Sequence, residues 1–139
     1  MRIATVLTFL LGALLLPAQQ PSSKINVIPA QATRAESGKE MFNAYCASCH
    51  GVDGKGSGPA ASALKTQPSD LTQLAHRNGG KYPGLAVINT LKDGTPNAHG
   101  SKDMPVWGPI LLSVSPNGPA VVQQRMTNLT AYIESLQAK

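Results

Sequence analysis

Residues 46–50 read Cys-Ala-Ser-Cys-His, and this pentapeptide constrains the fold of the chain more than any other feature. A C-x-x-C-H run is typical of covalent haem attachment, in which the thiols form thioether bonds to the macrocycle and the imidazole binds the iron. On a helix, Cys46 and Cys49 share a side with His50, so the three side chains can meet one flat group. The chain has 2 cysteines, and a single haem accounts for both. The motif therefore predicts a fold built around one haem held by Cys46, Cys49 and His50.

Three other uses of a cysteine pair compete with haem attachment. A thioredoxin-like redox site needs a βαβ setting, and the residues around the motif have no alternating strand pattern. A structural zinc site needs a second ligand pair at finger-like spacing, whereas His76 and His99 lie 23 residues apart. An ordinary disulfide remains open on the pentapeptide alone. The rest of the chain has to decide between these readings.

The first 18 residues have the proportions of an export signal. Met1-Arg2 supplies a positive start, residues 3–16 are apolar and uncharged, and Pro17 ends the run. The run is too short for a membrane-spanning helix and fits a signal peptide. Leu16 does not fit the small-residue pattern before a cut after Ala18, so an uncleaved N-terminal membrane anchor is the alternative. We expect an exported, periplasmic location, where covalent haem attachment takes place.

The composition limits both the core and the partners. Aromatic residues make up only 4% of the chain, so a single small domain of this length would struggle to bury enough apolar surface. A bound haem would supply the missing apolar bulk.

The formal net charge is +5, or +4 without Arg2, and the cations are spread singly along the chain. This excludes a nucleic-acid-binding pattern and leaves either a solvated surface or docking to an acidic partner protein.

The chain divides into three parts. Residues 1–18 form the signal, residues 19–35 are polar and aperiodic and predict a flexible linker, and residues 36–139 form one folded domain. Ser37 and Glu40 fit a capping box at the start of this domain. The apolar residues that follow have helical spacing, so the haem motif is expected at the end of a short amphipathic helix.

The rest of the domain predicts further helices and long loops. Residues 51–59 are rich in glycine and are expected to let the backbone pass close to a flat cofactor. Helices are predicted over 69–80, around 85–93 and over 119–137, with a long loop through 96–116. No segment predicts a strand. The fold class is therefore all-α, with one domain.

The choice of a second axial ligand decides what a bound haem can do. A strong sixth ligand suits electron transfer, whereas an open iron face favours gas binding or peroxide chemistry. Met41 and Met126 lie on apolar helix stripes, which is typical of core methionines, but Met104 lies in the long loop beside Pro105. We predict Met104 as the iron ligand opposite His50. His99 reads most simply as a surface histidine, with contact to a propionate or replacement of Met104 as alternatives.

The order of these motifs resembles that of class I c-type cytochromes, the small mono-haem electron carriers. The resemblance rests on the haem motif, on Asp53-Gly54-Lys55-Gly56 and on Met104-Pro105-Val106-Trp107-Gly108, and it covers residues 36–137. It implies a small cytochrome c fold of three to five short helices and long loops, wrapped around one covalently bound haem c.

The same resemblance implies roles for several residues. Gly38 and Phe42 should pack against Tyr132 where the first and last helices cross, with Gly38 permitting a close approach. Trp107 should pack against the macrocycle or donate its indole N–H to a propionate.

Together these features predict an exported mono-haem cytochrome that carries single electrons between redox partner proteins by cycling between ferrous and ferric iron. No residue pattern suggests a general base, a nucleophile or a substrate pocket, so we predict no catalytic residues. One alternative is a dedicated haem subunit of a periplasmic dehydrogenase or oxidase. Others are a haem enzyme or gas sensor with an absent or labile Met104 ligand, and a haem-free interaction module.

Overall fold

The computed structural model describes residues 30–94 and 103–138, and these ranges contain helices and loops but no strand, which confirms the all-α prediction. No helix in these ranges has the length and apolar character needed to cross a membrane. The elements, in chain order, are α1 Gly38–Met41, the π-helical η1 Phe42–Cys46, α2 Ala47–His50, the 3₁₀-helical η2 Ala61–Ala63 and η3 Leu71–Gln73, α3 Leu74–Arg77, α4 Gly84–Asp93, α5 Trp107–Ser113 and α6 Pro119–Ser135.

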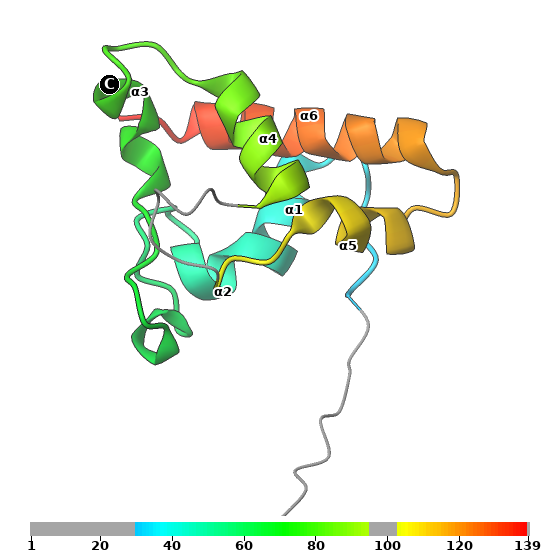
Figure 1. Cartoon of the computed structure of the whole chain (residues 1–139), viewed down its shortest axis with the longest axis horizontal. Helices are drawn as coiled ribbons and strands as arrows, with labels where there is room; N and C mark the ends of the chain where they lie inside the picture. Colours follow the sequence, from blue (N-terminus) through cyan, green and yellow to red (C-terminus); the bar gives the residue numbers. More distant parts are fainter. Residues whose placement is uncertain (1–29, 95–102, 139) are drawn as a thin grey trace, which may run out of the picture.

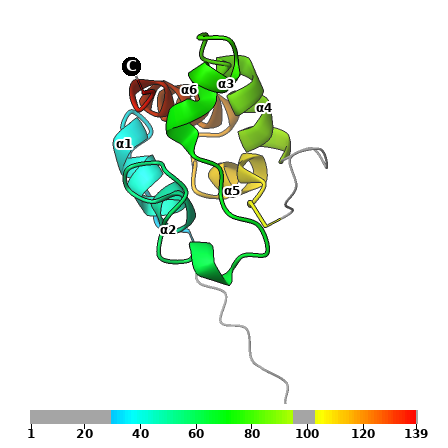
Figure 2. The same cartoon turned by 90° about the vertical axis from the view of Figure 1, so that its left-hand side faces the viewer.

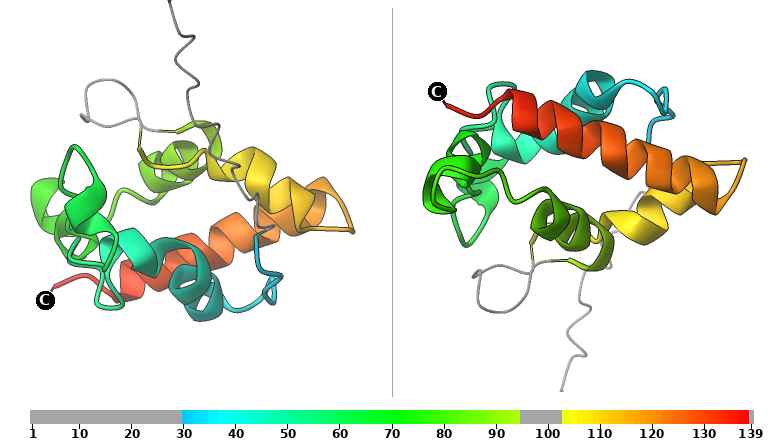
Figure 3. Two further views of the ribbon diagram at one scale, coloured as in Figure 1. Left: turned by 90° about the horizontal axis from the view of Figure 1, so that it is seen from below. Right: turned by 90° about the horizontal axis from the view of Figure 1, so that it is seen from above.

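The helices are arranged around a central region rather than in layers. Helix α6 is the longest and runs along one side of the molecule, with α4 crossing it (Figure 1). Viewed from the end that carries α3, α1 and α2 lie on one side and α4 and α5 on the other (Figure 2). The views from below and above show the same ring of elements, with α6 forming one long edge (Figure 3). Side chains from all sides of this ring meet in one apolar core, in which Met41, Phe42, Leu111 and Leu129 are fully buried.

Helices α1 and α6 cross closely at Gly38. A Cβ at this position would collide with the carbonyl oxygen of Asn128 and with the Cβ of Tyr132, so only glycine fits there without movement. One turn later, the rings of Phe42 and Tyr132 lie 5.3 Å apart between centroids, at an angle of 57°. The expected packing of Gly38 and Phe42 against Tyr132 is confirmed.

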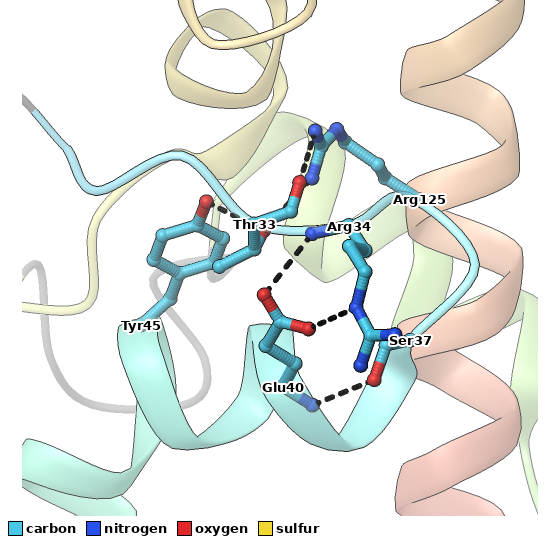
Figure 4. Close-up of polar contacts among 6 residues, drawn as sticks. All are labelled: Thr33, Arg34, Ser37, Glu40, Tyr45 and Arg125. Carbon is cyan, nitrogen blue, oxygen red and sulfur yellow. Dashed lines mark hydrogen bonds and ion pairs between the residues drawn. The ribbon is translucent and has the colours of Figure 1, made fainter.

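The predicted capping box is only half formed. Ser37 caps α1, because its Oγ accepts a hydrogen bond from the backbone N–H of Glu40 at 3.2 Å. The carboxylate of Glu40 does not reach back to Ser37 but accepts from the backbone N–H and Nε of Arg34, at 3.2 and 2.7 Å (Figure 4). The N–H of Ser37 instead donates to the Arg34 carbonyl at 3.2 Å, which leaves Glu40 free to pair with Arg34.

The packed part of the chain begins before Ser37, which differs from the expected linker boundary at residue 35. Thr33 is 8% exposed, and its Oγ1 lies 2.8 Å from the hydroxyl of Tyr45. The guanidinium of Arg125 on α6 donates to Thr33 as well (Figure 4). A polar residue such as Thr33 is typical of a linker in the sequence. In the structure it is part of the domain, because the buried guanidinium of Arg125 donates hydrogen bonds to it.

The prediction of a continuous loop over 96–116 is wrong, because helix α5 occupies Trp107–Ser113. It begins at Trp107, and its Pro109 occupies the first turn, where a missing N–H costs no helical hydrogen bond. Leu111, in the middle of this helix, is fully buried. The helix has only seven residues, one of them a proline, so its periodicity is too brief to distinguish it from a loop. The other predicted helices are present as η3–α3, α4 and α6, with Pro119 as the first residue of α6.

Candidate haem site

The two motif cysteines lie in consecutive helical segments, Cys46 at the end of η1 and Cys49 within α2. A π-helical turn closes at Cys46, and an ordinary α-helical turn then runs from Ala47 to His50. Both cysteines are free thiols, so the disulfide alternative is not adopted. Cys46 is 7% exposed, and burial, with a smaller effect of the nearby Cys49, raises the pKa of its thiol to about 12. A thiol held protonated in this way is unsuited to a thioredoxin-like redox site, which needs a thiolate of lowered pKa.

The imidazole of His50 is oriented by a backbone carbonyl. Its Nδ1 lies 3.0 Å from the carbonyl oxygen of Ser69, so this nitrogen carries the proton and donates it. Nε2 is thereby left as the ring nitrogen with a free lone pair, which is the usual arrangement of a metal-binding histidine. Burial lowers the pKa of His50, partly offset by the hydrogen bond to Ser69. The ring is therefore neutral at pH 7, in the form that binds a metal ion.

The glycine-rich segment after the motif folds back over the end of α2. The N–H groups of Gly56 and Gly58 donate to the carbonyls of His50 and Cys49, at 2.7 and 3.0 Å. Gly56 has φ +82°, and a Cβ there would collide with the carbonyl oxygen of Pro68. At these positions the glycines allow backbone to approach backbone, a role that was not anticipated from the sequence. Their effect is to hold the carbonyl groups at the C-terminal end of the motif helix.

Met104 lies outside the helices, three residues before α5. Its side chain is partly buried and packs against the apolar core cluster that contains Cys46 and Trp107. The structure therefore brings Cys46, Met104 and Trp107 into one cluster from segments almost sixty residues apart. Cys49 and His50 are partly exposed and are the last two residues of α2, which begins directly after Cys46.

Trp107 is the first residue of α5 and is 8% exposed. Its ring lies 5.4 Å from that of Tyr45, centroid to centroid, at 31°. Tyr45 is the neighbour of Cys46, so this contact connects the Met104 segment to the motif helix. Contact of Trp107 with the macrocycle or a propionate remains a prediction.

Several residues that shape the site were missed by sequence reasoning. Ser69 acts through its backbone carbonyl, which no side-chain pattern reveals. Tyr45 belongs to the apolar residues with helical spacing before the motif, and nothing in the sequence indicates its contact with Trp107. Of the spare histidines, His76 is exposed on α3, and His99 lies outside the described residues.

These residues fit a covalently attached haem. Two thiols in a helical C-x-x-C-H run, neither in a disulfide, are available for thioether bonds to the macrocycle. A neutral imidazole with Nε2 free and a thioether packed against the same apolar cluster as Cys46 are available as iron ligands. An apolar surrounding with few polar atoms suits a porphyrin, and sulfur and imidazole suit its iron.

Comparison with known proteins agrees with this chemistry. The sequence model of the cytochrome c family, described as "Cytochrome c", matches residues 35–137. A curated relative, cytochrome c-554(547) of Halothiobacillus neapolitanus, is 30% identical over 105 residues, which cover 74% of this chain and 97% of the relative. No solved structure gave a significant match. The chain therefore belongs to the cytochrome c family, whose members carry covalently bound haem c and transfer electrons.

Proposed function

We propose that this chain is an exported mono-haem electron carrier, in which Cys46 and Cys49 would attach haem c and His50 and Met104 would be the two protein ligands of its iron. The observation that carries the proposal is that Met104 lies outside the helices and packs against the core cluster that contains Cys46 and Trp107, whereas the cluster's own methionines, Met41 and Met126, are buried on helices. Cytochromes c are generally exported, and the apolar N-terminal run supports this for the present chain.

Bound at this site, haem c supplies a reversible one-electron change at its iron. The protein residues set how easily that change occurs. The soft thioether of Met104 favours ferrous iron and raises the reduction potential relative to a second histidine. The apolar cluster around Cys46 acts in the same direction, because it disfavours the extra positive charge of the ferric state. The hydrogen bond from His50 to Ser69 acts in the opposite direction, because it makes the imidazole a stronger donor.

The segment that follows the motif supports docking to an acidic partner protein. It carries four exposed cations, Lys55, Lys65, Arg77 and Lys81, against the acidic Asp53 and Asp70. An excess of one charge sign raises association rates with an oppositely charged partner at low ionic strength. Reduction by an acidic redox protein should therefore slow as salt is added. An electron-transfer rate independent of salt would remove this part of the proposal.

The test is a visible spectrum of the exported protein, purified in oxidised and reduced forms. We expect haem that stays with the denatured polypeptide, a low-spin ferric state, and the charge-transfer band of thioether ligation at neutral pH. High-spin ferric haem would instead indicate an open iron face, and with it the enzyme or gas-sensor alternative. Co-purification with a single dehydrogenase or oxidase would replace the free carrier with the dedicated-subunit alternative.

A further inference from the structure

The carbonyl group of Ser69, which accepts the hydrogen bond from Nδ1 of His50, belongs to a segment without helical structure. Ser69 lies between η2 and η3, so no helix fixes the direction of its carbonyl. On the N-terminal side, the Nε2 of Gln67 donates to the carbonyl of Gly56, and Pro68 lies against the same glycine. These contacts hold the chain before Ser69, and the position of its carbonyl also depends on the contacts of the residues after it.

The chain on the C-terminal side of Ser69 is held by the amide of Gln137, two residues beyond the end of α6. Nε2 of Gln137 donates to the carbonyls of Leu71 and Ile133, at 2.8 and 2.9 Å, and Oε1 accepts from the N–H of Ala75 at 2.8 Å. Both amide N–H groups and the amide oxygen are thus in use. A single side chain joins the end of α6 to η3 and α3, segments more than sixty residues away in the sequence.

The connection from Gln137 to Ser69 is short and stiff. Leu71, which accepts from Gln137, lies two residues after Ser69 and donates its own N–H to the carbonyl of Gly54 at 2.7 Å. Asp70, between them, caps η3 by accepting from the N–H of Thr72 at 2.9 Å. Few free torsions remain between the anchored Leu71 and the carbonyl of Ser69.

We propose that Gln137 is a positioning residue for His50. It anchors Leu71, and thereby aligns the Ser69 carbonyl with Nδ1 of His50, which sets the donor strength of the imidazole and the reduction potential of the protein. This inference rests on the proposed function, because it takes His50 as an iron ligand. Hydrogen-bond partners of a metal-bound histidine fix its orientation and raise its basicity, so loosening the partner weakens the ligand. A weaker donor stabilises ferric iron less, so the potential should rise.

The test compares Gln137→Met with Gln124→Met in the holoprotein. Methionine keeps the length of the side chain but removes all three hydrogen bonds. Gln124 is exposed on α6, the helix that precedes Gln137, so Gln124→Met is the control for the same change at a solvent-facing site. Two quantities are measured: the midpoint potential, and the solvent exchange of the His50 Nδ1–H by NMR in the diamagnetic ferrous state. The amide of Leu129, in the buried core, reports global unfolding in the same experiment.

For Gln137→Met we expect the Nδ1–H of His50 to exchange about tenfold faster relative to the Leu129 amide. The ferric-to-ferrous equilibrium should shift toward ferrous by about threefold, or about 28 mV at 59 mV per tenfold for one electron. Gln124→Met should change neither quantity. If Gln137→Met lowers stability while the potential and the relative exchange stay unchanged, Gln137 is only structural and the inference is wrong.

Gln137→Glu keeps the inference testable if Gln137→Met does not yield holoprotein. The carboxylate can still accept from Ala75 but cannot donate to Leu71, so the same rise in exchange of the His50 Nδ1–H is expected. The added negative charge itself favours the ferric state, so the exchange and not the potential is the readout for this variant. Unchanged exchange would contradict the inference. The wild-type spectrum is measured first, and wild-type protein without haem, or with a ligand other than His50, would overturn the proposed function together with this inference. A normal wild-type spectrum with unchanged variants overturns the inference alone.

Discussion

Arg125 donates twice to Thr33, from Nη1 to the side-chain Oγ1 at 2.9 Å and from Nη2 to the backbone carbonyl at 2.7 Å. Its Nε donates to the hydroxyl of Ser115 at 3.0 Å, and the whole side chain is only 5% exposed. A guanidinium buried among neutral acceptors is stabilised only if these hydrogen bonds form together. The residue therefore joins three segments of the chain: the stretch before α1, the turn before α6, and α6 itself.

Replacing Arg125 with methionine should lower the free energy of unfolding by about 2–4 kcal/mol, since charged hydrogen bonds are lost and the backbone carbonyl of Thr33 loses the guanidinium that donates to it. Urea denaturation of the holoprotein measures this loss. Limited proteolysis should also cut the chain near Thr33 more readily. Lys39→Met, at an exposed position on α1, is the control and should change stability by less than about 0.5 kcal/mol. Equal stability of the two variants would mean that Arg125 does not hold the N-terminal segment.

The helix crossing at Gly38 leads to a second prediction. Gly38→Ala places a methyl group against the Asn128 carbonyl, so α1 must move away from α6, at a cost of about 1–3 kcal/mol. Thermal unfolding of the holoprotein checks it. Gly84→Ala is the matched control, because a Cβ there would meet only ordinary contacts near Tyr82 and the backbone has no positive φ. If Gly38→Ala proves as stable as Gly84→Ala, the close crossing is not a feature of the protein in solution.

The sequence predicted the parts of the molecule whose causes are local or that follow from family resemblance. The spacing of apolar residues identified α4 and α6, and the resemblance placed Gly38 and Phe42 against Tyr132. These positions are specified by residue type, since only glycine tolerates the crossing and aromatic rings fill it.

The parts that could not be predicted depend on backbone groups or on distant partners. Every residue has a backbone carbonyl, so the sequence does not distinguish that of Ser69 from the others. Its role follows from the fold, which places it 3.0 Å from Nδ1 of His50. Glu40 fits a capping box in the sequence, yet the cation at Arg34 competes for its carboxylate. Thr33 reads as linker because its burial is caused by Arg125, ninety-two residues away.

The pair of Arg34 and Glu40 predicts a pH dependence of stability. The side-chain hydrogen bond from Arg34, followed by the hydrogen bond from its backbone N–H, lowers the pKa of Glu40 in the folded protein, and the charge of Arg34 adds a smaller effect in the same direction. As pH falls below the ordinary glutamate pKa of about 4.3, the unfolded chain takes up the proton first, so the contribution is present above that pH and is lost as pH falls through the folded pKa. Both side chains are solvent-accessible, so the effect should be small.

Glu40→Gln should therefore flatten the acid limb of the stability curve. The measurement is the free energy of unfolding of wild type, Glu40→Gln, Arg34→Gln and the double variant, from neutral pH into the acid range. The coupling between the two sites should vanish at low pH, where both states carry a protonated Glu40. A coupling that persists unchanged in acid would contradict an ionic origin.

Met104 and Met126 allow the proposed iron ligand to be separated from a core methionine. Met104 is partly buried outside the helices, whereas Met126 is 3% exposed on α6. Met104→Ala should abolish the thioether charge-transfer band, give a high-spin or water-bound ferric state, and lower the reduction potential, because the ligand that favours ferrous iron is gone. Met126→Leu conserves volume, so it should keep the spectrum and potential and cost less than about 1.5 kcal/mol of stability. Ultraviolet–visible spectra and potentiometry of both variants decide the assignment. If Met126→Leu loses the band and Met104→Ala keeps it, Met104 is not the ligand, and α6 would have to supply the sulfur.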